Sequence, residues 1–348
     1  MRPDQEERVR ALIGTLTGTQ AGREILASAL QSSGHALMRQ ATLDAFPTCT
    51  DPDRLAGART GIILDSETTG LEAKDEVVEL AMLRFRFDAG GILALDAVFN
   101  ELREPGVPIS EEASRVTGIT AETVAGCRIT DEQIRSFTEG AELVIAHNAA
   151  FDRQMVERSF PGAGFDQIPW HCSLSQVDWL SRGKNGRSLE VLALSEGYVY
   201  GSHRADADVI ATALVLNGGV GQTPFAELLR NGELDTIHVI AKDSRFDAKD
   251  ALKAAGFRWS NDGSDAYGHR AWHKEVPATP EELLALAELI RSPAVYGKEM
   301  SLPAFRIGAL TRYSGREPAA GQENFRTAEF LDLKEELEAR LPDQPCLF

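Results

Sequence analysis

A short apolar segment that ends in two acidic residues constrains the fold of this chain more than any other feature. Residues 61–64 (Gly-Ile-Ile-Leu) have the composition of a buried strand, and Asp65 and Glu67 follow directly. Side chains two positions apart on a strand point to the same side of a sheet, so both carboxylates can reach one point. Clustered acids are costly unless a cation neutralises them, and oxygen ligands suit magnesium or manganese. The alternative is an exposed strand end with no ligand.

The segments after this strand alternate between strand and helix patterns. Further strands are predicted at 77–87 and 92–99, joined at Gly90-Gly91, and at 143–146. Helices are predicted at 110–117, 131–139, 151–160, 188–195 and 205–216. A meander of three strands followed by alternating strand and helix indicates one α/β domain over residues 58–220.

Three other segments complete the predicted organisation. Residues 1–57 form an N-terminal helical segment that ends near a turn-like break at Asp51-Pro52-Asp53. A boundary at 222–224 precedes a small α+β module at 233–276. Residues 277–348 are predicted to be a helical tail, with one helix starting at Thr279 and a last one over 327–341.

Composition excludes several classes of protein. Among 348 residues, 53 Asp and Glu against 36 Lys and Arg give a net charge of −17, which argues against polyanion binding over the whole surface. Local contacts or bound metal ions would still allow a nucleic-acid enzyme. The four cysteines form no CxxC pair, which excludes a disulfide scaffold and a thiolate zinc site. With no signal-like N-terminus and no apolar run near 18 residues, the sequence predicts a cytoplasmic protein without membrane association.

Two further acidic motifs are predicted where helices begin. The sequence His-Asn-Ala-Ala-Phe-Asp ends at Asp152, at a strand-to-helix junction facing the carboxyl edge of the sheet. The sequence His-Arg-Ala-Asp-Ala-Asp runs from His203 to Asp208. A histidine with an ordinary pKa can accept a proton from water at neutral pH. Taken singly, each motif could instead be a helix-capping acid or a loop histidine without chemistry.

Other acids near these motifs are predicted to be solvated. Asp206 lies two residues before Asp208 and therefore on another face of the helix. Asp75 and Glu79 are predicted to be surface charges rather than ligands.

In this order, Asp-x-Glu, His-Asn-x-x-Phe-Asp and His-x-Ala-x-x-Asp resemble the three motifs of the DEDD exonuclease superfamily. The histidine five residues before the last aspartate is typical of its His-containing branch. The resemblance covers residues 60–218 and is strongest to the proofreading (epsilon) subunit of bacterial DNA polymerase III and its free-standing relatives. It implies an RNase H-like mixed sheet flanked by helices. Relatives commonly carry a histidine at the position of Thr117, which leaves the choice of substrate open.

The resemblance also implies an activity and a role for each motif residue. The activity is 3′→5′ exonuclease action in DNA repair or replication, releasing 5′-mononucleotides from single-stranded or frayed DNA 3′ ends by two-metal hydrolysis. His203 would be the general base. The remaining roles are metal ligands for two Mg²⁺ or Mn²⁺ ions (Asp65, Glu67, Asp152, Asp208) and substrate contacts (Thr68, Leu71 and Phe151, the last most simply a core residue). The alternatives are an exoribonuclease that trims RNA 3′ ends and a catalytically idle adaptor.

Two features of the last third suggest partners. Aromatic residues of the 233–276 module could stack on unpaired bases or simply form its core; they are Phe257, Trp259, Tyr267 and Trp272. The final peptide Gln-Pro-Cys-Leu-Phe places Gln344, Leu347 and Phe348 in a pattern resembling the peptides that bind the bacterial sliding clamp. Clamp binding is therefore expected, with a chance match as the alternative.

Overall fold

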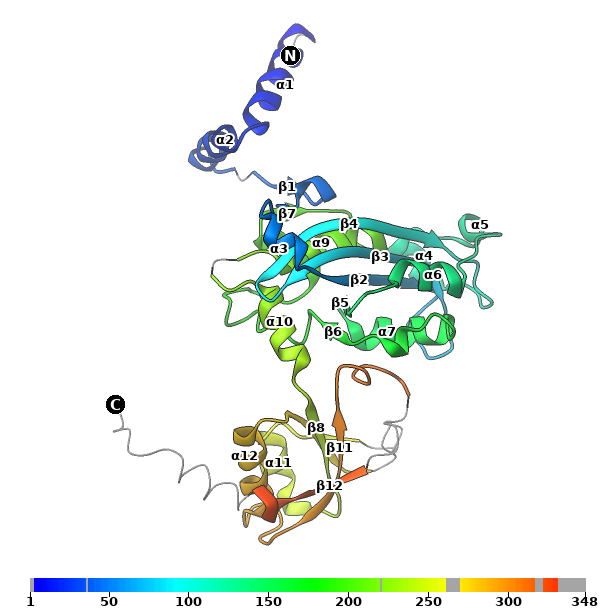
Figure 1. Ribbon diagram of the computed structural model, residues 1–348, viewed down its shortest axis with the longest axis vertical. Helices are drawn as coiled ribbons and strands as arrows, with labels where there is room; N and C mark the ends of the chain where they lie inside the picture. The colour runs from blue at the N-terminus through cyan, green and yellow to red at the C-terminus, as the bar shows by residue number, and fades with distance from the viewer. Residues whose placement is uncertain (1–2, 36, 220, 261–269, 317–321, 331–348) are drawn as a thin grey trace, which may run out of the picture.

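The structure is a computed structural model that describes residues 3–35, 37–219, 221–260, 270–316 and 322–330 (Figure 1). Its first sheet has the strand order β4-β3-β2-β5-β6. The strands are β2 (Arg59–Thr68), β3 (Val77–Asp88), β4 (Gly91–Leu102), β5 (Leu143–Ala146) and β6 (Trp170–Cys172). β2, β3 and β4 pair antiparallel, whereas β5 and β6 run parallel to β2. The predicted mixed sheet is confirmed.

Helices cover both faces of this sheet because consecutive residues of its central strand are apolar, which makes both faces hydrophobic. On β2, Ile63 belongs to the core beneath α9 (Ala205–Leu216). Its neighbours Ile62 and Leu64 belong to the other core, beneath α7 (Ala149–Ser159). The smaller helices near the sheet are α4 (Glu111–Thr117), α5 (Ala121–Val124), α6 (Asp131–Thr138) and α8 (Leu189–Ser195). The predicted α/β architecture is therefore the observed one.

Helix α10 (Pro224–Glu233) was not predicted from the sequence. Thr223 caps it by accepting a hydrogen bond from the amide of Ala226, and Pro224 occupies its first turn. Phe225 is fully buried, with its ring centroid 5.9 Å from that of Phe85 and 5.3 Å from that of Phe87. The hydrophobic core of the first sheet thus extends beyond residue 220.

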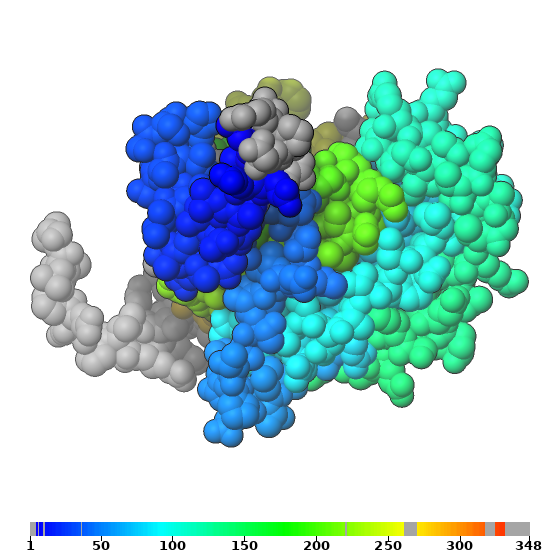
Figure 2. Space-filling view, turned by 90° about the horizontal axis from the view of Figure 1, so that it is seen from above, coloured from blue at the N-terminus to red at the C-terminus, as the bar shows by residue number. Residues whose placement is uncertain are grey.

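The N-terminal segment contains two helices, α1 (Pro3–Thr17) and α2 (Gln20–Ser32), which contact each other at the end of the molecule that is uppermost in Figure 1 and nearest the viewer in Figure 2. After α2, β1 (Arg39–Gln40) pairs with β7 (Tyr198–Val199), and a short 3₁₀ turn spans Leu43–Ala45. The turn predicted at residues 51–53 is wrong. Asp51 instead caps a short helix, α3 (Pro52–Ala56), because its carboxylate accepts two amide hydrogen bonds and proline suits the first helical position.

A second sheet has the order β12-β11-β8-β10-β9. Its strands are β8 (Thr236–Ala241), β9 (Arg258–Trp259), β10 (Trp272–Pro277), β11 (Ser301–Ile307) and β12 (Gln322–Arg326). A 3₁₀ turn (Phe246–Ala248), α11 (Lys249–Ala254) and α12 (Pro280–Arg291) accompany it. The prediction of a helical tail over 277–348 is wrong in part, because β11 and β12 pair antiparallel and β11 pairs with β8.

A loop that follows β11 connects the second sheet to the first (Figure 1). We call residues 308–316 the strap. The guanidinium of Arg153, which is fully buried on α7, donates to the carbonyl oxygens of Leu310 (2.7 Å) and Arg312 (2.8 Å). The amide of Trp170 on edge strand β6 donates to the carbonyl of Ala309 at 2.8 Å. The strap therefore satisfies polar groups of both α7 and β6.

The aromatic residues of the small module have different surroundings. Phe257 is buried in the core of the second sheet, whereas Trp259 is 46% exposed and packs edge-on against Trp272. Tyr267 lies outside the described residues, as do residues 331–341 of the predicted last helix and the terminal peptide with Gln344, Leu347 and Phe348. Among the residues that the structure describes, every helix is too short or too polar to cross a lipid bilayer.

Candidate active site

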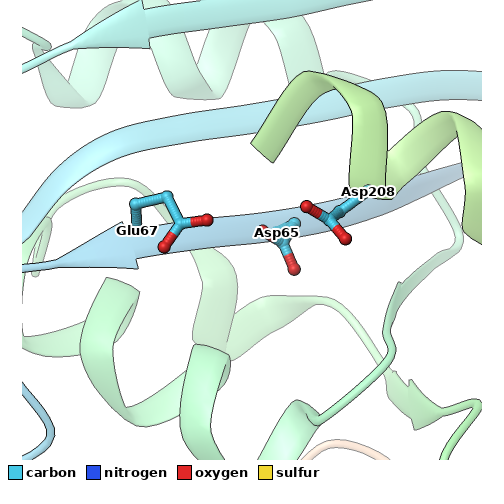
Figure 3. Close-up of side chains that lie close together, drawn as sticks. All are labelled: Asp65, Glu67 and Asp208. Atoms are coloured by element: carbon cyan, nitrogen blue, oxygen red, sulfur yellow. The ribbon is translucent and has the colours of Figure 1, made fainter. Parts of the chain in front are cut away.

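Three carboxylates converge at the end of strand β2 (Figure 3). Asp65 and Glu67 point to the same side of this strand, and Asp208 reaches them from the first turns of α9. One ligand oxygen from each side chain lies within 4.8 Å of the other two. This convergence follows from strand alternation and from the packing of α9 across β2 and β3. The sequence predicted all three members of this cluster.

Asp152, the fourth predicted acid, borders the cluster but is held by another group. It is 3% exposed, and its Oδ1 accepts hydrogen bonds from the hydroxyl of Ser66 (2.8 Å) and the amide of Ser66 (3.2 Å). Ser66 lies between Asp65 and Glu67 and points to the opposite side of the strand. No local sequence pattern indicated this serine's role, because its partner is 86 residues away.

Burial and mutual repulsion raise the pKa values of the acids in this cluster. Burial, and then the charges of Asp152 and Asp208, raise the pKa of Asp65 well above its usual range. Burial and the charge of Asp208 raise the pKa of Glu67 to about 7. A divalent cation would relieve this repulsion, and the donor set consists of the hard oxygen ligands that Mg²⁺ and Mn²⁺ prefer. The residues present therefore fit divalent metal ions.

Asp208 is oriented by two groups that precede it in the sequence. The Tyr200 hydroxyl donates to its Oδ1 at 3.0 Å, and the amide of Arg204 donates to its Oδ2 at 3.2 Å. His203 is exposed and has a φ of 65°, in the left-handed region that few residues other than glycine adopt. No sequence motif pointed to Tyr200.

The prediction that Glu79 is a surface charge is wrong. Its residue exposure is 0%, and it pairs with Arg204 at 3.0 Å. The signal was present in the sequence, since Glu79 is the one charged residue in the apolar run Val-Val-Glu-Leu-Ala-Met-Leu. An acid inside a buried strand requires a partner.

The other predicted residues differ in burial and in hydrogen bonding. Thr68 is buried and donates to the carbonyl of Gly70 at 2.6 Å. Leu71 is 83% exposed, and Phe151 packs partly against the core beneath α7. Asp206 is half-buried, as is Asp75, which accepts hydrogen bonds from Thr69 and from the amide of Glu72. Thr117 donates to the carbonyl of Ala113 at the end of α4.

His147, the first residue of the second motif, is a structural residue that the sequence did not distinguish. Its Nδ1 lies 2.9 Å from the Ser173 hydroxyl and its Nε2 lies 2.9 Å from the carbonyl oxygen of Arg187. Burial lowers the pKa of His147 to about 4, so the ring is neutral at physiological pH. It connects the turn before α7, the helix that carries Asp152, to two points of the segment between β6 and α8.

The raised pKa of Glu67 predicts that the folding stability of the protein depends on pH once EDTA has removed divalent ions. The folded state holds this proton up to about pH 7, whereas an unfolded glutamate loses it near 4.5, so stability falls as pH rises between these values. Glu67→Gln should therefore raise Tm relative to the parent protein more at pH 8 than at pH 5. Burial lowers the pKa of both His147 and His171 to about 4, so these two residues make stability rise with pH. Both proteins contain them, so their contribution cancels in the Tm difference between the variant and the parent protein. A difference in Tm that is independent of pH would contradict the prediction.

Part of this chain is similar to known proteins. Residues 62–216 match the family described as Exonuclease (RNase_T). Over 117 residues the chain is 34% identical to a PolC-type DNA polymerase III of Bacillus cereus, covering 33% of this chain and 8% of that protein. Over 164 residues it is 34% identical to a DNA polymerase III subunit epsilon-like protein of Rhodobacter capsulatus, covering 44% and 23%. The chain thus spans less than a quarter of the length of either relative.

Among solved structures, one described as exonuclease X in complex with 5′ overhanging duplex DNA aligns with a TM-score of 0.36 and 25% identity, covering 48% of this chain and 98% of the other. The first sheet of this chain is a mixed sheet with an acidic cluster at the end of its central strand. Residues 62–216, which contain this cluster, match the exonuclease family.

Proposed function

We propose that this protein is a 3′→5′ exonuclease that removes nucleotides from DNA ends. The observation that carries the proposal is the convergence of Asp65, Glu67 and Asp208 inside a domain of the exonuclease family. The curated relatives are named as DNA polymerase III proteins, which favours DNA over RNA as the substrate. A divalent cation would relieve the repulsion between these acids, which favours an active site over a catalytically idle adaptor.

Each residue of the site has a proposed role. Asp65, Glu67 and Asp208 would hold two divalent ions, with Asp152 as a further ligand once it turns from Ser66 or shares its second oxygen. The ions would supply charge to activate water and to stabilise the leaving 3′ oxygen. His203 would accept the proton of the attacking water. Thr68, Leu71 and Phe151 are proposed to contact the terminal nucleotide, and the exposed Leu71 side chain is free to pack on a base.

A matched digestion tests the proposal. The purified protein would be incubated with Mg²⁺ or Mn²⁺ and 5′-labelled single-stranded DNA, a mismatched duplex or RNA of the same sequence. A ladder that shortens from the 3′ end of DNA, and that Asp65→Asn abolishes, is the expected result. Cleavage of RNA alone would move the assignment to RNA processing. An inactive protein that binds the sliding clamp through residues 344–348 would favour the adaptor.

His203→Ala should separate proton transfer from metal binding. Losing a positioned general base is expected to lower turnover by about 10²–10⁴-fold. Mn²⁺ binding measured by calorimetry should stay close to that of the parent protein, because no carboxylate is removed. His203→Ala protein that cleaves at the parental rate from pH 6 to 9 would exclude the general-base role.

A further inference from the structure

The buried carboxylate of Glu79 accepts hydrogen bonds from three other residues of the protein. Glu79 lies directly opposite Glu67 on the neighbouring strand, and both side chains are on the same face of the sheet. The Glu79 carboxylate nevertheless lies outside the trio of converging carboxylates. Its Oε1 accepts from Arg204 Nη2 at 3.0 Å and from Asn100 Nδ2 at 3.3 Å. Its Oε2 lies 3.4 Å from both Arg204 Nε and the amide of Ala205.

These contacts connect the sheet to the loop that carries the candidate base. Arg204 stands between His203 and the first residue of α9, and its own amide donates to Asp208. A bidentate contact between a guanidinium and a carboxylate fixes the orientation of the two side chains as well as their distance. The strained backbone at His203 also needs a neighbour that holds it in place.

We propose that Glu79 and Arg204 form a positioning pair, which rests on the proposed function: the pair holds the backbone from which His203 and Asp208 extend toward the substrate. Glu79 is then neither a surface charge nor a metal ligand. Arg204 also places a positive charge beside Glu67, opposing the mutual repulsion of the acids. The pair acts on the reaction only through the residues that it orients.

A double-mutant cycle tests the proposal on the full chain. Glu79→Gln and Arg204→Met should each lower kcat at least tenfold, with KM changed less than about threefold, at a temperature well below the Tm of every variant. The double variant should be no slower than the slower single variant, because either change releases the same loop. Arg204→Lys, which keeps the charge, should recover part of the loss. Additive losses, or a parental kcat in Glu79→Gln, would overturn the proposal.

A second measurement does not depend on nuclease activity. Trypsin cleaves after Arg204 only when the start of α9 opens, so Glu79→Gln should increase the rate of cleavage at this bond about fivefold or more. The matched control is Glu227→Gln, which breaks another partly buried Arg–Glu pair, with Arg182 at 2.7 Å, and should alter neither this rate nor kcat. An unchanged tryptic rate in Glu79→Gln overturns the positioning pair. A parent protein inactive on every substrate overturns the proposed function instead, and leaves the tryptic difference in place.

Discussion

Asp65→Asn is expected to lower the rate of phosphodiester cleavage by at least about a thousandfold, which corresponds to roughly 4 kcal/mol of transition-state stabilisation. Asp65 lies at the centre of the acidic cluster, between Glu67 on its own strand and Asp208 on α9. Asparagine has the same shape but a neutral amide in place of one carboxylate oxygen, so it is a poor ligand for a hard divalent ion. The measurement is single-turnover cleavage of labelled single-stranded DNA in Mn²⁺.

The same variant should be more stable than the parent protein when metal is absent. Burial and the neighbouring acids disfavour a charge at Asp65, and asparagine removes that charge. In EDTA at pH 8, Asp65→Asn should melt at a higher temperature than the parent protein. Adding Mn²⁺ should stabilise the parent protein and not the variant, because only an intact site gains binding energy. A variant that loses activity and also melts lower in EDTA would indicate a structural role for Asp65.

The sequence predicted the parts of this site that depend on local periodicity. Asp65 and Glu67 share a side because strands alternate, and Asp208 is near the start of a helix whose bounds, Ala205–Leu216, match the prediction. It did not predict the groups that hold these acids. Ser66 and Asp152 meet across 86 residues, and no local pattern encodes such a contact.

Helix α10 and strands β11 and β12 were harder to predict than the site, because contacts with residues far away in the sequence decide their structure. A Gln-Thr-Pro sequence is typical both of a linker and of a helix start, and here Thr223 caps α10. Only the position of Phe225 among the rings of Phe85 and Phe87 distinguishes the two. Strands β11 and β12 were missed because Gly and Pro dominate the segment around them, whereas pairing with β8 decides their structure.

A chain that ends at residue 220 is expected not to fold, although the family match ends at residue 216. Removing α10 takes Phe225 out of a fully buried aromatic cluster, and a truncated aromatic residue in a core costs about 3–5 kcal/mol. Removing the strap takes two carbonyl partners from the Arg153 guanidinium, which keeps its ion pair with Glu157 at 2.8 Å. Each hydrogen bond lost from a charged group costs about 1.5–3 kcal/mol. Together these losses approach the total stability of a typical domain, about 5–15 kcal/mol.

Three proteins separate the contribution of α10 to stability from the contribution of the strap. The chain 1–220 should be insoluble or lack a cooperative thermal transition, whereas the full-length variants Phe225→Ala and Arg153→Met should each fold with a lower Tm. Because Arg153 follows Asp152 on α7, Arg153→Met should also weaken cleavage, while Phe225→Ala should affect stability alone. Circular dichroism melts and the DNA digestion provide both readouts. A soluble, cooperatively folded and active 1–220 chain would show that the exonuclease-family domain is independent of α10 and the strap, and that the second sheet is an appended unit.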